Sequence, residues 1–307
     1  MLSFLPSCFL GIIAIVLMTL VTCVCMIPLY ILSLSKFLIR LPAWQRVCGR
    51  MVTGIAKIWI WGILSTLKLT QKISWDVEGT GNLSFGEWYF VNSNHQHWTD
   101  ILVILKVLVG RIPFPKFFLK KELFWVPMLG TAWWALDYPF MKRYSKDFIE
   151  KHPELRGADL ETTRKACARY KQSPVSIINF IEGTRFTKEK HDRQKSPYRH
   201  LLRPKAGGLA FAINAMAGRI TDMLDVTIVY PEGPGSGKFW DFISGRVSRI
   251  VVRVRKLKIP EEFLSGDYEC DPDFRKRFQE WVSGLWHKKD EQIERLTRKY
   301  NLAEYRQ

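Results

Sequence analysis

The chain has 307 residues, of which 47% are hydrophobic, so it can form one large domain with its own core as well as a separate apolar segment. Forty-six Lys and Arg against 29 Asp and Glu give a net charge of +17, which favours anionic partners such as phospholipid surfaces, phosphorylated substrates or nucleic acid. Six irregularly spaced cysteines exclude a disulfide framework and a cysteine zinc site, so we expect a reducing compartment.

An uncharged apolar run over residues 9–34 is the first element of the chain. Its length exceeds the ~20 apolar residues with which a helix crosses a bilayer. The chain lacks both the basic stretch before the run and the small-residue cleavage site after it that mark a secretory signal peptide. Because Lys36, Arg40, Arg46 and Arg50 follow with no cation upstream, the positive-inside rule places that end in the cytoplasm. We therefore predict a retained transmembrane helix over about 9–34.

A second apolar run, over 51–69, leaves two topologies open, because a second span would carry the rest of the chain back across the membrane. Lys57 and Lys68 disfavour this, since a lysine at the centre of a membrane helix costs roughly 3 kcal/mol. Tryptophans flanked by basic residues are typical of a helix lying in the membrane interface, and we predict such a helix over about 44–69. Residues 1–70 then form a membrane anchor, and residues 71–307 form a domain on the cytoplasmic face.

The domain from residue 71 onward alternates predicted strands with predicted helices. Such alternation is typical of an α/β fold, with a largely parallel sheet flanked by helices. The charged, aperiodic stretch 188–203 is predicted to be a loop, and basic residues alternating along 247–259 predict a strand with one face in water or against headgroups. The predicted strands cover 73–78, 88–91, 114–119, 137–143, 176–181, 226–230 and 247–259, and the predicted helices cover 99–109, 122–136 and 160–172, with two more beginning near 206 and 271.

The polar stretch Asn92–Asp100 joins a strand-like run to a helix-like run, and α/β folds carry their chemistry at such junctions. If residues 95 to 100 were all helical, His95 and Asp100 would point about 140° apart. If His95 instead leaves the strand end and Asp100 lies in the first helical turn, the carboxylate folds back onto the imidazole. The second arrangement would be a His–Asp dyad able to act as a general base.

Two further polar clusters follow predicted strands, at 137–143 and 182–185. Because the carboxyl ends of parallel strands share one edge of a sheet, we expect these clusters to meet the dyad there. Arg143 and Arg185 carry planar donor forks suited to phosphate, and Lys142 adds a point charge. Gly183 allows a ligand to approach the backbone closely. The sequence thus predicts a phosphate-binding site beside the dyad.

Metal and nucleic-acid chemistry are both disfavoured. His95, His97 and Asp100 have the spacing of a metallo-hydrolase box, but the other histidines occur singly, without the carboxylates such a site needs. The basic excess is spread along the chain, without an RNA- or DNA-binding motif. We expect no metal, and because no protein nucleophile accompanies the dyad, the reacting hydroxyl is expected to come from the substrate. The charge alone leaves one non-catalytic alternative, a membrane protein that binds anionic lipid or nucleic acid.

Four blocks of residues together resemble the PlsC-like glycerolipid acyltransferases, over about residues 70 to 235. The N-terminal anchor and two longer strings, over 134–145 and 161–164, further resemble the YihG-type branch of bacterial inner-membrane acyltransferases. His97 departs from the family pattern, in which a small residue such as serine is usual. The four blocks are Asn94-His95-x4-Asp100, Phe140-Met141-Lys142-Arg143, Phe180-Ile181-Glu182-Gly183-Thr184-Arg185 and Val229-Tyr230-Pro231.

The resemblance implies transfer of an acyl chain from acyl-CoA or acyl carrier protein to the sn-2 hydroxyl of 1-acylglycerol-3-phosphate, giving phosphatidic acid. It implies no cofactor beyond that co-substrate, partners in the phospholipid bilayer and a lysophospholipid, and a location in the inner membrane with the domain facing the cytoplasm. Lysophosphatidylglycerol, lysocardiolipin or glycerol 3-phosphate remain alternative acceptors. The motif core covers 90–235, and a C-terminal strand and amphipathic helix cover 245–300. The implied catalytic residues are His95 and Asp100, and the implied substrate-binding residues are Lys142, Arg143, Glu182, Gly183, Thr184, Arg185 and Pro231.

Overall fold

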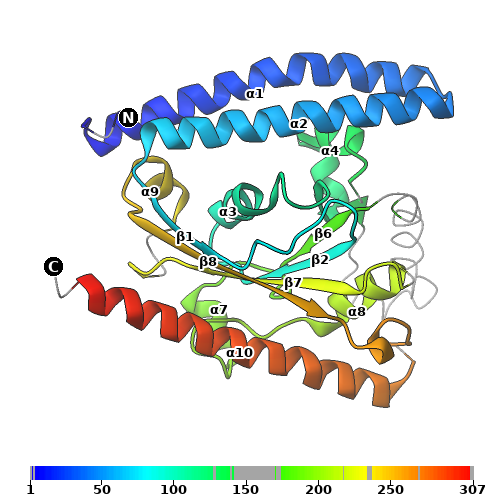
Figure 1. The fold of residues 1–307 in the computed structure, drawn as a ribbon, viewed down its shortest axis with the longest axis vertical. Helices are drawn as coiled ribbons and strands as arrows, with labels where there is room; N and C mark the ends of the chain where they lie inside the picture. Colours follow the sequence, from blue (N-terminus) through cyan, green and yellow to red (C-terminus); the bar gives the residue numbers. More distant parts are fainter. Residues whose placement is uncertain are drawn as a thin grey trace.

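The computed structural model describes residues 2, 4–126, 129–138, 140–141, 170, 174–216, 218–233, 237–268 and 270–304. Two long helices, α1 (Ser7–Leu38) and α2 (Pro42–Thr70), run antiparallel along one side of an α/β domain (Figure 1). Their bounds extend the two predicted N-terminal helices at both ends. Both are long and apolar enough to cross a membrane by length and composition.

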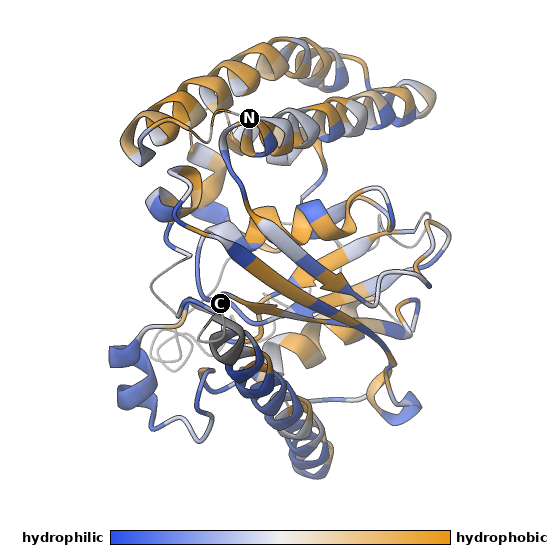
Figure 2. Cartoon of the chain, turned by 60° about the vertical axis from the view of Figure 1, so that its left-hand side comes forward, coloured by the Kyte–Doolittle hydropathy of each residue, from blue (hydrophilic) through white to orange (hydrophobic). Residues whose placement is uncertain are grey.

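The pair of helices, termed the hairpin below, packs along the domain with one face and exposes the other. Leu10, Ala14 and Leu29 of α1 are buried, and α1 contacts α2, α4 (Leu129–Ala135) and α9 (Phe239–Ile243). Gly62 lets the two helices approach closely, since a Cβ there would lie 2.6 Å from Val21 Cγ1. Large apolar side chains are exposed along both helices, and α2 also exposes Arg46, Arg50, Lys57 and Lys68. Figure 2 accordingly shows α1 mostly in orange and α2 in a mixture of orange, white and blue. Exposed large side chains include Phe9, Val16, Leu20, Ile27, Ile31, Leu34, Ile58 and Trp61.

A six-stranded sheet forms the centre of the domain, in the order β1-β8-β7-β2-β6-β3. All neighbouring pairs are parallel except β7 and β8, which are antiparallel. The predicted α/β fold with a largely parallel sheet is therefore confirmed. The strands are β1 (Ser74–Glu78), β2 (Tyr89–Ser93), β3 (Pro115–Phe117), β6 (Ser176–Asn179), β7 (Asp222–Val229) and β8 (Arg249–Lys258).

Helices cover both faces of this sheet and produce two separate cores. On the hairpin side, α3 (Thr99–Leu108) and α9 pack with α1 and α2 against the sheet. On the opposite side, α8 (Ala206–Ala215) and the C-terminal helix α10 (Pro272–Glu304) pack around Phe278 and Trp286 (Figure 1). Every residue of β2 is buried, as expected for an inner strand covered on both faces. This strand leads directly into the polar stretch Asn92–Asp100.

Shorter elements differ from the sequence predictions. The predicted helix over 122–136 is divided into η1 (Lys121–Trp125) and α4, and a two-stranded sheet pairs β4 (Leu119–Lys120) with β5 (Phe140–Met141). The predicted loop over 188–203 instead begins with a helix, α7 (Lys188–Gln194), whose N-terminus is capped by Thr187. A short turn of helix, η4 (Glu261–Phe263), precedes α10. The predicted helix over 160–172 lies, except for residue 170, outside the described residues.

The predicted wet face of the strand over 247–259 was wrong for its central arginine. Arg253 is buried, and its guanidinium binds both oxygens of Asp76 at 3.0 and 2.9 Å. Arg255 pairs with the fully buried Asp225, which also binds the buried Lys289 at 2.7 Å. The alternation of basic and apolar residues therefore reflects ion pairs with neighbouring strands and α10, which a single strand's pattern does not reveal.

Candidate active site

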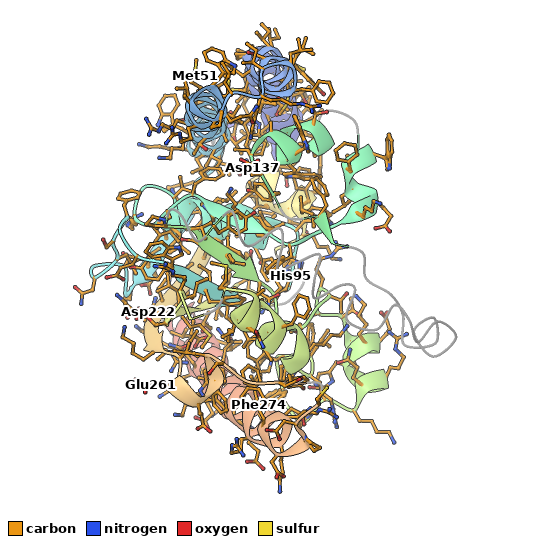
Figure 3. The ribbon with its side chains drawn as sticks, turned by 90° about the vertical axis from the view of Figure 1, so that its right-hand side faces the viewer. Met51, His95, Asp137, Asp222, Glu261 and Phe274 are labelled. Atoms are coloured by element: carbon orange, nitrogen blue, oxygen red, sulfur yellow. The ribbon has the colours of Figure 1, made fainter. Side chains whose placement is uncertain are left out.

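The dyad and the polar cluster 182–185 meet at one edge of the sheet. His95 lies two residues after β2, and Glu182 to Arg185 follow β6, the parallel neighbour of β2. The backbone N–H of Phe186 donates to the carbonyl of His95 at 2.8 Å, which joins the two segments directly. In Figure 3 His95 lies between the hairpin layer, marked by Met51, and the layer that contains Phe274. The expected convergence of strand ends thus holds for these two clusters.

His95 and Asp100 have the second of the two arrangements considered from the sequence. Asp100 is in the first turn of α3, and its Oδ2 lies 3.0 Å from His95 Nδ1. The same oxygen accepts the backbone N–H groups of Gln96 at 2.6 Å and His97 at 2.8 Å. The carboxylate is fully buried, whereas the His95 side chain is 14% exposed. Because Nδ1–H donates to Asp100, the Nε2 of His95 is left as the nitrogen that can take a proton.

Tyr230, one residue after β7, completes the environment of the carboxylate. Its hydroxyl donates to Asp100 Oδ1 at 2.8 Å and lies 3.1 Å from Thr99 Oγ1. Burial, and then the charge of Asp100, raise the pKa of Tyr230 well above its ordinary value, so the phenol stays a proton donor. Thr99 Oγ1 in turn donates to the carbonyl of Gly237 at 2.8 Å. The motif block that contains Tyr230 gave no sign of this contact, because the contact joins residues 130 positions apart.

Glu182 has a different position from the predicted one. Its carboxylate is 1% exposed, and its two oxygens accept the backbone N–H groups of His95 at 2.8 Å and Leu202 at 2.9 Å. Burial raises the pKa of Glu182 to about 8, although the two backbone donors act in the opposite direction. Glu182 therefore ties the catalytic turn to the segment before α8. The resemblance implied a substrate-binding role for Glu182, whereas here both carboxylate oxygens are bound by backbone N–H groups.

A cavity of about 210 Å³ opens beside His95 and is lined by Gly183, Thr184 and Arg185. Phe180 forms its apolar wall and stacks on the imidazole of His95, with ring centroids 3.9 Å apart. The guanidinium of Arg185 lies over the ring of Trp98 at 5.4 Å. Gly183 has a φ of +69°, a conformation that favours glycine. A cavity with one aromatic wall and an exposed cation thus opens beside the dyad.

The remaining predicted residues are less directly connected to this cavity. Pro231 is buried after β7 and is not among the residues that line the described cavity. Lys142 and Arg143 lie outside the described residues. Asp137, from the polar cluster 137–143, instead binds Lys36 of α1 through both carboxylate oxygens, at 3.0 and 2.9 Å.

His97 packs against Tyr230 and Gly237 and is not among the described residues that line the cavity of His95. Its ring lies edge-on to Tyr230, with centroids 5.4 Å apart, and it fills the space beside Gly237. Among the described residues, no group of three or more His, Cys, Asp or Glu side chains is arranged to hold a metal ion.

The Acyltransferase family model matches residues 74–231, which include the dyad, Glu182 to Arg185 and Tyr230. The chain belongs to the acyltransferase family. The family resemblance predicted from the motif blocks is thus confirmed, and the protein is an acyltransferase enzyme.

Relatives of this acyltransferase have low sequence identity to it. The 1-acyl-sn-glycerol-3-phosphate acyltransferase 3 of Arabidopsis thaliana is 25% identical over 285 residues, covering 86% of this chain and 69% of that protein. The 1-acyl-sn-glycerol-3-phosphate acyltransferase gamma of Mus musculus is 26% identical over 179 residues, covering 56% and 43%. The crystal structure of the acyltransferase PlsC from Thermotoga maritima matches 96% of both chains, with a TM-score of 0.51 and 17% identity. This last similarity concerns the fold alone.

Proposed function

We propose that this acyltransferase moves a fatty acyl chain from an acyl-CoA or acyl carrier protein thioester to the sn-2 hydroxyl of 1-acylglycerol-3-phosphate, forming phosphatidic acid. The observation that carries the proposal is the His95–Asp100 pair, whose imidazole lines a cavity that Arg185 and the ring of Phe180 also line. Relatives named as 1-acyl-sn-glycerol-3-phosphate acyltransferases support the choice of acceptor.

In this proposal His95 acts as the general base. Its Nε2 removes the proton of the acceptor hydroxyl while the oxygen attacks the thioester carbonyl. Asp100 holds the ring through Nδ1 and stabilises the imidazolium that forms. When the tetrahedral intermediate collapses, the C–S bond breaks and the proton on His95 passes to the leaving sulfur. The ester product and the free thiol balance the reaction, without an acyl-enzyme.

Direct attack by the acceptor is supported by the side chains around the cavity. Among the described residues that line it, Thr184 carries the one hydroxyl, and no serine or cysteine is present. That hydroxyl accepts a hydrogen bond from Lys190 Nζ at 2.8 Å, which holds it away from a nucleophilic role. The reacting hydroxyl is therefore assigned to the acceptor lipid.

Arg185 is the proposed ligand of the acceptor's phosphate. It is exposed at the mouth of the cavity and, among the described residues, has no acidic partner. Its planar fork suits phosphate oxygens, and Gly183 and Thr184 lie beside it. Lys142 and Arg143 are proposed as additional phosphate ligands from the sequence motif alone. Fixing the phosphate would orient the sn-2 hydroxyl toward His95.

The hairpin is proposed to hold this site at the cytoplasmic surface of the inner membrane. Its outward apolar side chains are suited to lipid contact, and the opposite face is already packed on the domain. Both the lyso acceptor and the product reside in that membrane. Basic residues after α1 support a cytoplasmic location for the domain.

Product analysis of the purified protein tests this function. Mixed lyso acceptors and mixed acyl-CoAs are supplied, and mass spectrometry identifies which acceptor gains an acyl chain. We expect lysophosphatidate to be acylated in preference to lysophosphatidylglycerol, lysocardiolipin and glycerol 3-phosphate. His95→Ala should abolish transfer, whereas His200→Ala, a histidine paired with Glu294 away from the cavity, should retain it. Turnover in His95→Ala would refute the mechanism, and another preferred acceptor would refute the assigned substrate.

A further inference from the structure

A second and larger cavity lies on the side of the sheet opposite the hairpin. Its volume is about 1180 Å³, and its walls come from the segment before α8, from α8 itself and from α10. Ligand sites commonly have volumes of about 300–1,000 Å³, so this cavity is large enough for a sizeable ligand. Because the sheet separates it from the hairpin, its occupant would approach from water and not from lipid (Figure 1).

The charge around this cavity is strongly positive. Arg203, Lys205 and Arg275 line it, and Asp267 is the one acidic residue among its described lining. An anionic ligand is therefore favoured.

An aromatic side chain is held in place beside these cations. Tyr268 lines the cavity, and its hydroxyl accepts a hydrogen bond from Gln279 Nε2 at 2.9 Å. Arg275 donates through Nε to the carbonyl of Tyr268 at 2.9 Å, with its guanidinium over the same ring at 5.8 Å. Gly207 approaches the edge of this ring so closely that a Cβ would lie 3.1 Å from it. A fixed ring beside guanidinium groups is suited to a ligand that combines a planar base with phosphates.

The two cavities are neighbours. Lys205 lines the larger one, and its side chain lies against Gly183, where an added Cβ would be 2.9 Å from Lys205 Cδ. Gly183 itself lines the cavity of His95. A ligand bound by Arg203 and Lys205 could therefore extend past Gly183 to the dyad.

We infer that the larger cavity binds the adenosine 3′,5′-bisphosphate portion of an acyl-CoA donor. The phosphates contact Arg203 and Lys205, the base lies against Tyr268, and the thioester end of the donor reaches His95 past Gly183. This assignment rests on the proposed acyl transfer, and it selects CoA over a carrier protein as the donor. The acceptor then enters from the hairpin side while the donor enters from the aqueous side.

Binding of adenosine 3′,5′-bisphosphate to the full-length protein in lipid nanodiscs tests the inference without requiring turnover. Arg203→Ala and Lys205→Ala should each weaken binding about 10-fold, because each removes a charge-assisted phosphate contact. Arg193→Ala is the matched control, since it removes an exposed cation of α7 that does not line the cavity. Its dissociation constant should stay within about twofold of the wild-type value.

Kinetics with two donors separate this inference from the proposed reaction. Arg203→Ala should raise the KM for acyl-CoA about 10-fold and leave the KM for S-acyl-pantetheine, which lacks the nucleotide, unchanged. Equal KM values for the two donors in the wild-type protein, or turnover with acyl carrier protein alone, would overturn the inference and leave the His95 reaction intact. Nucleotide binding with the predicted variant pattern in a protein that acylates no lyso acceptor would support the cavity assignment and count against the reaction.

Discussion

Tyr230→Phe is the substitution that most directly tests how the dyad is held. The phenol is the one donor to Asp100 Oδ1 among the described residues, whereas Oδ2 accepts from His95, Gln96 and His97. Removing it leaves a fully buried carboxylate oxygen without a donor. A hydrogen bond to a charged group is worth about 1.5–3 kcal/mol. We therefore expect a loss of about that size in the free energy of unfolding.

The same substitution should slow catalysis through the position of the carboxylate. Without its Oδ1 donor, Asp100 can rotate away from the plane in which it binds His95 Nδ1. Because about 1.4 kcal/mol corresponds to a factor of ten in rate, a loss near the lower end of the range predicts a kcat about 10-fold lower. Tyr230 does not line the cavity of His95, so the KM of the acceptor should not change.

Tyr89→Phe provides a matched control for this experiment. Tyr89 is also fully buried, and its hydroxyl also donates to a carboxylate, that of Glu87, at 2.6 Å. Its loss should lower the free energy of unfolding and leave kcat unchanged, since Glu87 precedes β2 and the dyad follows it. Acyl transfer from labelled acyl-CoA and thermal unfolding are measured on all three proteins. A changed acceptor KM in Tyr230→Phe, or an equal fall of kcat in both variants, would refute a positioning role.

Three further predictions follow from the site and the hairpin. Arg185→Ala should raise the acceptor KM about 10- to 100-fold with little change in kcat, whereas Lys188→Ala should leave the acceptor KM unchanged. Steady-state kinetics at varied lysophosphatidate measures this KM, and a change confined to the donor KM would contradict the phosphate role. Burial raises the pKa of Glu182 from 4.5 to about 8, so between these pH values the folded state retains a proton that the unfolded state releases. The free energy of unfolding should therefore fall by about 1.4 kcal/mol per pH unit as the pH rises through this range. Thermal unfolding measured across this pH range should show no such pH dependence in Glu182→Gln. An unchanged pH dependence in this variant would show that another group causes it. Combining Ile31→Glu with Trp61→Glu, at side chains 64% and 71% exposed, should reduce flotation of the protein with liposomes, and undiminished flotation would count against the hairpin as the lipid contact.

The parts of the site that the sequence predicts are those set by short stretches of chain. The turn between β2 and α3 is only five residues long, so the polar run between two apolar runs left two arrangements for His95 and Asp100, and the structure has the one in which they meet. The alternation of strands and helices predicts that β2 and β6 run parallel, so that Arg185 and His95 both follow carboxyl ends at one edge of the sheet. Local pattern and one general rule of sheet topology account for these placements.

The remaining contacts depend on strand order and on burial, which local patterns do not encode. The family resemblance implied that Glu182 binds substrate, yet its carboxylate binds the backbone of His95 and of Leu202, 20 positions away. Arg253 was expected to be wet because its neighbours alternate, yet β8 is inserted between β1 and β7 and pairs it with Asp76. In both cases a charged side chain is buried by partners from distant parts of the chain. Sequence alternation alone does not distinguish such a residue from a solvated one.

The position of His97 gives a physical account of its departure from the family pattern. A Cβ on Gly237 would lie 2.2 Å from His97 Cδ2 and 3.0 Å from Tyr230 Cζ, so glycine at 237 leaves the room that the imidazole occupies. The same glycine offers its carbonyl to Thr99, whose hydroxyl lies beside that of Tyr230. His97, Gly237 and Tyr230 thus form one packed unit behind Asp100. The large residue at 97 therefore belongs to the packing behind the carboxylate, and it is not among the described residues that line the cavity of His95.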